Sequence, residues 1–205
     1  MWKRKGLAVG LVAVVLSMVL LFTVPSGYFV AATFASTACM IGASLAAGGY
    51  RKLFTPRLKT LAIGLVSAVL LYLVFFAGNL GISSAHPFGI NPSAENSIYS
   101  LIASPANPLY VQAGVLLFDS VGYESFFRGV LQTKAQPRLG RAAPFAVAAV
   151  DAALHVLTLN PLWVVTTFIA DTVWGLTYYY ANDLSSSMTS HIIWDVLIFI
   201  VYPVR

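Results

Sequence analysis

Charged residues and cysteine are scarce in this sequence. Asp, Glu, Lys and Arg make up 9% of its 205 residues, whereas hydrophobic residues make up 59%. A soluble domain carries about 25% charged residues, so these few polar groups cannot cover a surface that faces water. We therefore expect lipid to surround much of the protein. The single cysteine, Cys39, excludes an intramolecular disulfide and a metal site built from several cysteines.

Positive charge is confined to short segments. The net charge is +5, and ten of the twelve Lys and Arg residues fall within Lys3–Lys5, Arg51–Lys59 and Lys134–Arg141. Basic segments between apolar runs are typical of the cytoplasmic loops of membrane proteins. They also lack the interleaved aromatic residues on which nucleic-acid bases stack, so we expect no nucleic-acid partner.

Seven apolar stretches are long enough to be membrane helices. They lie at about 6–24, 28–48, 60–82, 108–132, 143–159, 161–181 and 187–203. The sequence therefore predicts an all-α, polytopic transmembrane helical bundle of about seven spans. A second apolar run follows the first almost at once, which favours a retained helical hairpin over a signal peptide.

The basic segments also predict the topology. They place the N-terminus on the cytoplasmic side. The membrane itself is expected to be the plasma (cell) membrane. The connection 83–107 contains no Lys or Arg and is expected to be an irregular excursion on the outer side. At the turn before the seventh span, Ser186 or Ser187 is expected to cap the helix that follows. Trp174 and Tyr178–Tyr180 are expected to lie in an aromatic belt at the membrane interface.

Ionisable residues divide the chain into two parts. Residues 1–107 form an N-terminal transmembrane scaffold of three spans and the outer loop, without ionisable residues in the apolar cores of the spans. Residues 108–205 form a helical core of four spans. An ionisable group at the bilayer centre costs about 2.5–3.5 kcal/mol on insertion scales, so those of the core must face one another or a water-filled cavity. They are Asp119, Glu124, Arg128, Asp151, His155, Asp171, His191 and Asp195.

Six of these residues are spaced as pairs four residues apart, each pair within one predicted span. Residues four apart share a face of a helix, where their side chains can meet. The predicted depths of the pairs in the membrane overlap, so they can converge on one cavity. The pairs are Glu124 with Arg128, Asp151 with His155, and His191 with Asp195.

Such a cavity suits the hydrolysis of a peptide bond in either of two ways. Glu124, His155 and His191 could hold a divalent metal such as zinc, which would activate a water molecule. Equally, a carboxylate can act as general base on water while histidines stabilise the oxyanion. Both chemistries stay open, and in both Arg128 is expected to pair with Glu124 and keep that carboxylate ionised.

Three motifs in this half of the chain resemble those of the CPBP intramembrane proteases, also called the CAAX protease or Abi family. Segment 123–129, YESFFRG, resembles the first motif, E-E-x-x-x-R. His155 stands where the second motif, F-x-x-x-H, has its histidine. His191 and Asp195 match the third, H-x-x-x-N or H-x-x-x-D. The resemblance covers about 108–203.

The resemblance implies an intramembrane endopeptidase that cleaves a membrane-associated protein or peptide by carboxylate-activated water. The family is glutamate-dependent and was once described as metal-dependent. Members resemble the enzyme that removes the last three residues of prenylated CAAX proteins, and others act in bacteriocin self-immunity. Carried over by position, the implied catalytic residues are Glu124, Arg128, His155, His191 and Asp195.

The sequence departs from the family motifs at two positions. Tyr123 replaces the first glutamate, which is the family's presumed water-activating base, and Asp151 replaces the phenylalanine of the second motif. Three interpretations follow. Glu124 acts as the base, or another carboxylate, Asp151 or Asp119, takes its place, or the protein is an inactive CPBP-like binding or immunity protein.

An ion or proton transporter is the alternative from another functional class. Asp119, Glu124, Asp151 and Asp171 would form its relay. The sequence shows neither paired broken helices nor an inverted repeat, so this alternative ranks last.

Overall fold

The computed structural model describes residues 4–48, 53–85, 92–102 and 107–204, and within these ranges it contains helices and no strand. Lys3, Arg51 and Lys52 of the basic segments lie outside these ranges. The helices are α1 (Arg4–Thr23), α2 (Phe29–Ala47), α3 (Leu58–Ala85), α4 (Pro92–Ile102), α5 (Leu109–Phe126), α6 (Thr133–Leu139), α7 (Ala143–His155), α8 (Pro161–Ala181) and α9 (Leu184–Val196). Phe127–Gln132 and Leu197–Val201 continue α5 and α9 as π-helical segments.

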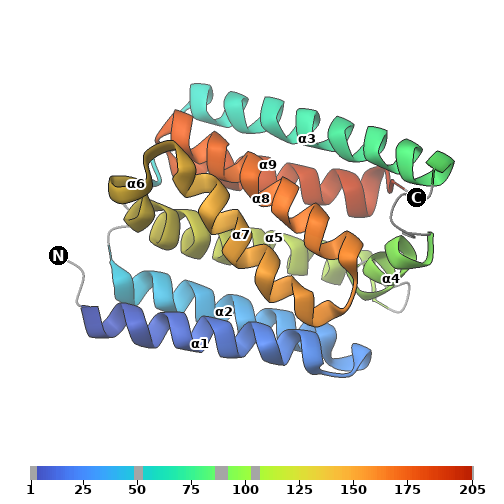
Figure 1. Cartoon of the computed structure of the whole chain (residues 1–205), viewed down its shortest axis with the longest axis horizontal. Coiled ribbons are helices and arrows are strands. Elements are labelled where there is room, and N and C mark those ends of the chain that lie inside the picture. Colours follow the sequence, from blue (N-terminus) through green and yellow to red (C-terminus); the bar gives the residue numbers. More distant parts are fainter. Residues whose placement is uncertain (1–3, 49–52, 86–91, 103–106, 205) are drawn as a thin grey trace.

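The predicted helical membrane bundle is confirmed, and each predicted span contains a helix. Among the described residues, four helical stretches are both long and apolar enough to cross a membrane: Ser26–Ala47, Leu58–Gly81, Leu109–Thr158 and Leu184–Val201. The third contains α5 and α7, which run in opposite directions (Figure 1). The chain reverses at Gly140, whose φ of +52° favours glycine. The total of seven spans stays a prediction.

The expectation of an irregular connection at 83–107 was wrong over much of its length. Helix α3 continues to Ala85, and α4 occupies Pro92–Ile102. Helix α4 was missed because it is short and only partly apolar, so no membrane-length run marks it. It packs against α8 at the end of the bundle where the α7–α8 turn lies (Figure 1).

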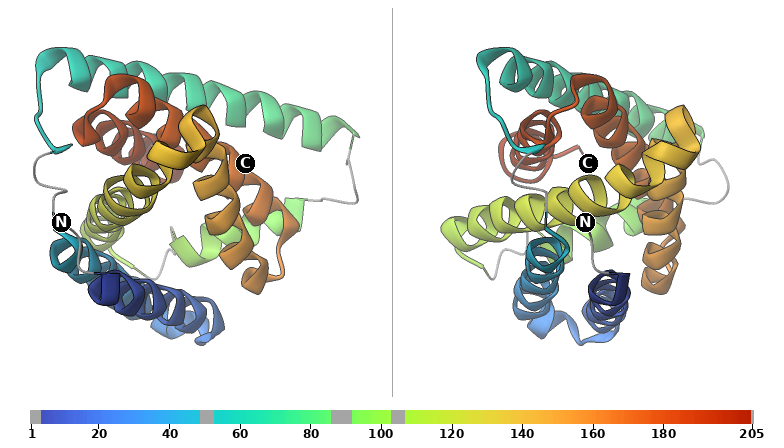
Figure 2. Two further views of the ribbon diagram at one scale, coloured as in Figure 1. Left: turned by 60° about the vertical axis from the view of Figure 1, so that its left-hand side comes forward. Right: turned by 90° about the vertical axis from the view of Figure 1, so that its left-hand side faces the viewer.

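The α1–α2 hairpin and α3 lie on opposite sides of the C-terminal helices (Figures 1 and 2). Helix α2 packs against α5, and α3 packs against α9. The α2–α5 contact is close because α5 has a glycine there. A Cβ atom on Gly122 would lie 2.5 Å from Cγ2 of Thr37. Small residues at such crossings allow helices to approach closely in a membrane.

The turn before α9 is fixed by an aspartate. Asp183 is the N-cap of α9, and its side chain accepts a hydrogen bond from the backbone N–H of Ser185. It also accepts one from the hydroxyl of Thr55, which precedes α3. The expectation that Ser186 or Ser187 caps this helix was therefore wrong, because the helix begins at Leu184 and both serines lie inside it.

Candidate active site

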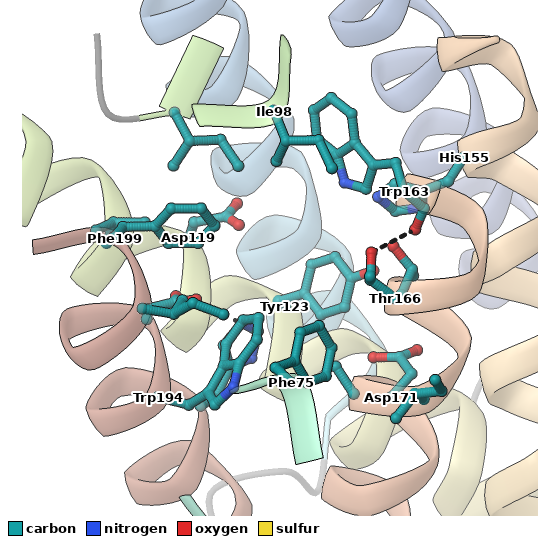
Figure 3. A pocket seen from close by; sticks show the side chains of 18 of the residues that line it. Phe75, Ile98, Asp119, Tyr123, His155, Trp163, Thr166, Asp171, Trp194 and Phe199 are labelled. Carbon is teal, nitrogen blue, oxygen red and sulfur yellow. Dashed lines mark hydrogen bonds and ion pairs between the residues drawn. The ribbon is translucent and has the colours of Figure 1, made fainter. Parts of the chain in front are cut away.

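A cavity of about 480 Å³ lies between the C-terminal helices and is also lined by residues of α1–α4. Most of its lining is apolar, including Phe75 of α3 and Ile98 of α4 (Figure 3). The cavity also has polar lining residues, most of them ionisable or hydroxyl-bearing. They include Asp119, Tyr123, His155, Thr166, Thr167, Asp171, His191 and Asp195.

His191 is held by partners on its edges and on one face. Its Nδ1 lies 3.0 Å from Oε1 of Glu124, and its Nε2 lies 3.5 Å from Oδ2 of Asp195. Trp174 stacks on the imidazole with ring centroids 3.6 Å apart and planes inclined by 13°. The hydroxyl of Ser120 donates to the same oxygen of Asp195 at 2.8 Å. The ring therefore has a fixed orientation at the wall of the cavity.

Arg128 is fully buried and joins two carboxylates. Its Nε lies 3.5 Å from Oε2 of Glu124, so the predicted pair is in contact. Asp171 of α8 lies closer, with Oδ1 at 2.5 Å from Nη2 and Oδ2 at 3.5 Å from Nη1. Arg128 lies on the π-helical segment after α5, a kind of irregularity frequent at functional sites. No motif marked Asp171; its acidity within a predicted span was the available signal.

Glu124 is as deeply buried as Arg128 and is not among the residues that line the cavity. Its carboxylate lies behind His191 and faces that imidazole and the guanidinium of Arg128. Glu124 can therefore act on a molecule in the cavity only through its contact with His191.

The two departures from the family motifs are in contact with each other. The hydroxyl of Tyr123 on α5 donates a hydrogen bond to Oδ2 of Asp151 on α7. The Tyr123 ring lines the cavity and stacks on Phe127, whereas Asp151 is fully buried outside the lining. A phenol and a carboxylate thus stand where the motifs have a glutamate and a phenylalanine, and they are hydrogen-bonded to each other.

His155 lines another part of the cavity wall. Its Nδ1 lies 3.0 Å from the backbone carbonyl oxygen of Asp151 and 3.7 Å from Oδ1 of the same residue. The predicted contact with Asp151 is therefore present, mainly through the main chain. Phe22 of α1 packs against the imidazole at 4.8 Å between ring centroids, and Trp163 at 5.9 Å.

Asp119 faces the cavity one helical turn before Tyr123. Its Oδ1 accepts a hydrogen bond of 2.6 Å from the hydroxyl of Thr37 on α2. Sequence reasoning placed Asp119 on the face of Tyr123 but could not find Thr37, because a threonine in an apolar helix carries no distinguishing signal.

The aromatic belt expected on α8 is wrong for two of its members. Trp174 and Tyr178 are buried. Trp174 stacks on His191, and the hydroxyl of Tyr178 is hydrogen-bonded to that of Thr133 at 2.8 Å. Tyr180 is exposed, as a belt residue would be. Aromatic residues on a bundle helix face either lipid or its neighbours, and composition alone does not separate the two.

The side chains do not fit a metal ion. In the described part of the chain, no three His, Cys, Asp or Glu side chains are grouped as metal ligands would be. Glu124 and His191 touch, but His155 does not complete a ligand set with them.

Comparison with protein-family models matches residues 105–197 to type II CAAX prenyl endopeptidase Rce1-like. This segment is therefore similar to the CPBP (CAAX protease) family. The match spans just under half of the chain and includes all five predicted site residues, but leaves α1–α4 outside. Comparisons with curated proteins and with solved structures gave no match.

Proposed function

We propose that this protein is an intramembrane endopeptidase that hydrolyses a peptide bond of a membrane-associated protein or peptide. The observation that carries the proposal is the setting of His191. Its imidazole lies at the wall of a mostly apolar cavity, between Glu124 and Asp195 and stacked on Trp174. A polar group held rigidly at an apolar site is the arrangement that stabilises charge developing during a reaction.

His191 would donate a hydrogen bond to the oxygen of the scissile carbonyl. An imidazolium ring donates from both nitrogens, and both face carboxylate oxygens here. Glu124 would fix the ring through Nδ1, and the N–H of Nε2, 3.5 Å from Oδ2 of Asp195, would be shared between that carboxylate and the scissile carbonyl. Glu124 is thus a positioning residue in this proposal, rather than the direct base that its motif position predicts, and Arg128 holds Glu124.

His155 would provide a second contact to the substrate. Its Nδ1 is directed at the carbonyl of Asp151, so Nε2 is the nitrogen left for the peptide or the water. A carboxylate that faces the cavity would take the proton of the attacking water. The proton then passes to the leaving amine as the C–N bond breaks.

The cavity also supports a substrate with an apolar portion. Its walls beyond the polar groups consist largely of aliphatic and aromatic side chains, such as Phe75, Ile98 and Phe199 (Figure 3). Apolar pockets with a few placed polar groups bind and orient apolar ligands. An apolar segment or attached group of the substrate would occupy this part while the scissile bond lies against His191.

A mass-spectrometric survey of protein termini tests the proposal. Membranes of cells that produce the unaltered chain are compared with those that produce His191→Ala at equal abundance. Ser190→Ala is the matched control, because Ser190 is buried beside His191 in sequence but does not line the cavity.

We expect new termini with the unaltered chain and with Ser190→Ala, but at least about 100-fold fewer with His191→Ala, the usual effect of removing an oxyanion donor. Identical termini from all three proteins would reject the proposal. That result would favour a binding or immunity protein of the same fold.

A further inference from the structure

We infer that Asp119 is the general base of this site and that Thr37, from a helix outside the family match, is its positioning residue. The inference rests on the proposed function, since it assigns a step of that hydrolysis. It is drawn from the partners that each carboxylate of the site already has.

Three aspartates line the cavity, and two of them are engaged. Both oxygens of Asp171 face the guanidinium of Arg128. Asp195 accepts from Ser120 and lies against Nε2 of His191 through the same oxygen. Within the described ranges no ion pair involves Asp119, whose single hydrogen bond comes from a neutral hydroxyl. Asp119 is therefore the lining carboxylate least occupied by other groups.

Asp119 lines the same cavity as both histidines, His155 and His191. In Figure 3 its carboxylate points into the space that Tyr123 and His155 border. A scissile carbonyl that accepts from His191 would lie in the cavity that this carboxylate also lines, and the attacking water would be held between the two.

The remaining acidic groups are less well placed. Glu124 and Asp151 do not line the cavity, and Tyr123 donates its hydroxyl hydrogen to Asp151. Residues 119 and 123 are four apart on one helix and share a face. The carboxylate that the motif places at 123 is therefore found one turn away, at Asp119.

Thr37 fixes the carboxylate of Asp119. Thr37 is fully buried and donates to Oδ1 at 2.6 Å, so Oδ2 is the oxygen left to accept a proton from water. The hydroxyl reaches Asp119 because Gly122 lets α2 approach α5. Helix α2 would thereby contribute to catalysis although the family match does not include it.

The hydrolysis needs only Asp119, His191 and one water molecule. Asp119 takes one proton from water as the water oxygen bonds to the carbonyl carbon, and the carbonyl electron pair moves to the oxygen that faces His191. When the C–N bond breaks, the proton on Asp119 passes to the leaving nitrogen. The products are a carboxylic acid and an amine, and Asp119 is ionised again.

The test uses the full chain in membranes, with the terminal survey run as a time course. It compares the unaltered protein with Asp119→Asn, Asp119→Glu and His191→Ala at equal abundance. We expect a roughly 10²- to 10⁴-fold slower appearance of new termini for Asp119→Asn, the usual range for a lost general base. We expect partial activity for Asp119→Glu, which keeps a carboxylate.

The Thr37 variants separate positioning from general packing. Thr37→Val should lower kcat about tenfold with KM unchanged on a synthetic peptide that spans an observed cleavage site, and Thr37→Ser should restore kcat. Thr33→Val is the matched control, since Thr33 is buried on α2 but donates to the carbonyl of Phe29. It should leave both constants unchanged.

Loss of cleavage in His191→Ala but full cleavage in Asp119→Asn would overturn the inference and leave the proposed function standing. The same holds if Tyr123→Phe abolishes cleavage while Asp119→Asn does not, because the proton would then pass through Tyr123 to Asp151. If His191→Ala cleaves as the unaltered chain does, the proposed function itself fails, and this inference fails with it.

Discussion

The buried polar side chains of the N-terminal helices α1–α3 and of the C-terminal helices α5–α9 differ in kind and in the partners that satisfy them. In α1–α3 the buried polar side chains are hydroxyls, several of which donate to a carbonyl of their own helix, as Thr33 does to Phe29 and Ser44 to Met40. In α5–α9 they include carboxylates, imidazoles and a guanidinium, whose partners often lie on other helices. A hydroxyl can be satisfied locally, whereas a buried charge needs a partner of opposite sign or a set of donors.

The N-terminal helices α1 and α2 contact residues of the candidate active site. Phe22 of α1 packs on His155, and Thr37 of α2 donates to Asp119. The neutral helices thus position charged groups that the C-terminal helices carry. The division of the chain at 107 and 108 stays a prediction about sequence, and these contacts cross it.

The largest effect is expected from removing Arg128, the buried cation of the C-terminal helices. Arg128→Met leaves the carboxylates of Glu124 and Asp171 without their shared partner, and breaking a buried ion pair costs about 3–5 kcal/mol. We expect a large loss of folded protein in detergent, measured by thermal unfolding. Adding Asp171→Asn should recover part of the stability, because one uncompensated charge is removed. A melting temperature unchanged by Arg128→Met would contradict the central role of this cation.

Forcing α2 away from α5 should have an intermediate effect. A Cβ atom in Gly122→Ala would lie 2.5 Å from Cγ2 and 3.1 Å from the backbone oxygen of Thr37. Overpacking of this kind costs about 1–3 kcal/mol, and it should also weaken the hydrogen bond to Asp119. Gly114→Ala on the same helix is the control, since a Cβ atom added there would meet no atom within 4 Å. Equal melting temperatures for the two variants would show that the α2–α5 contact adapts without cost.

The smallest effect is expected at the α8–α9 turn, where Asp183 accepts a hydrogen bond from Thr55, which precedes α3. Burial raises the pKa of Asp183, but hydrogen bonds from Ser185 and Thr55 outweigh it and hold the pKa below its usual range. Because the folded-state pKa is depressed, the resulting stability is fully present above the unfolded pKa of about 3.9. It is lost as the pH falls through the folded-state pKa.

Asp183→Ala should therefore cost about 0.5–2 kcal/mol near pH 7, as loss of an N-cap does. The difference from the unaltered protein should shrink on acidification, when melting temperatures are compared from about pH 7 to about pH 3. Asp183→Asn keeps a capping oxygen without the charge and should lose less stability at neutral pH. A difference that is constant with pH would show that the charge of Asp183 contributes nothing.

Contacts within single helices could be predicted from the sequence. Each of the three pairs spaced four apart is in contact, at 3.5 Å for Glu124 with Arg128 and for His191 with Asp195. Helical periodicity fixes such neighbours once an apolar run defines the helix. The sequence also indicated that Tyr123 and Asp151 belong to one site, because both depart from its motifs. Their hydrogen bond could not be predicted, because it depends on how α5 and α7 face each other.

The sequence by itself determined that this protein is a helical membrane bundle with its ionisable groups on the C-terminal helices. Too few polar residues are present for any other solvent, and each charge in an apolar run must be sheltered. Only the tertiary structure decided the partners of those charges. The rotation and approach of packed helices, set by small residues such as Gly122, place Asp171 on Arg128, Glu124 behind His191 and Thr37 on Asp119.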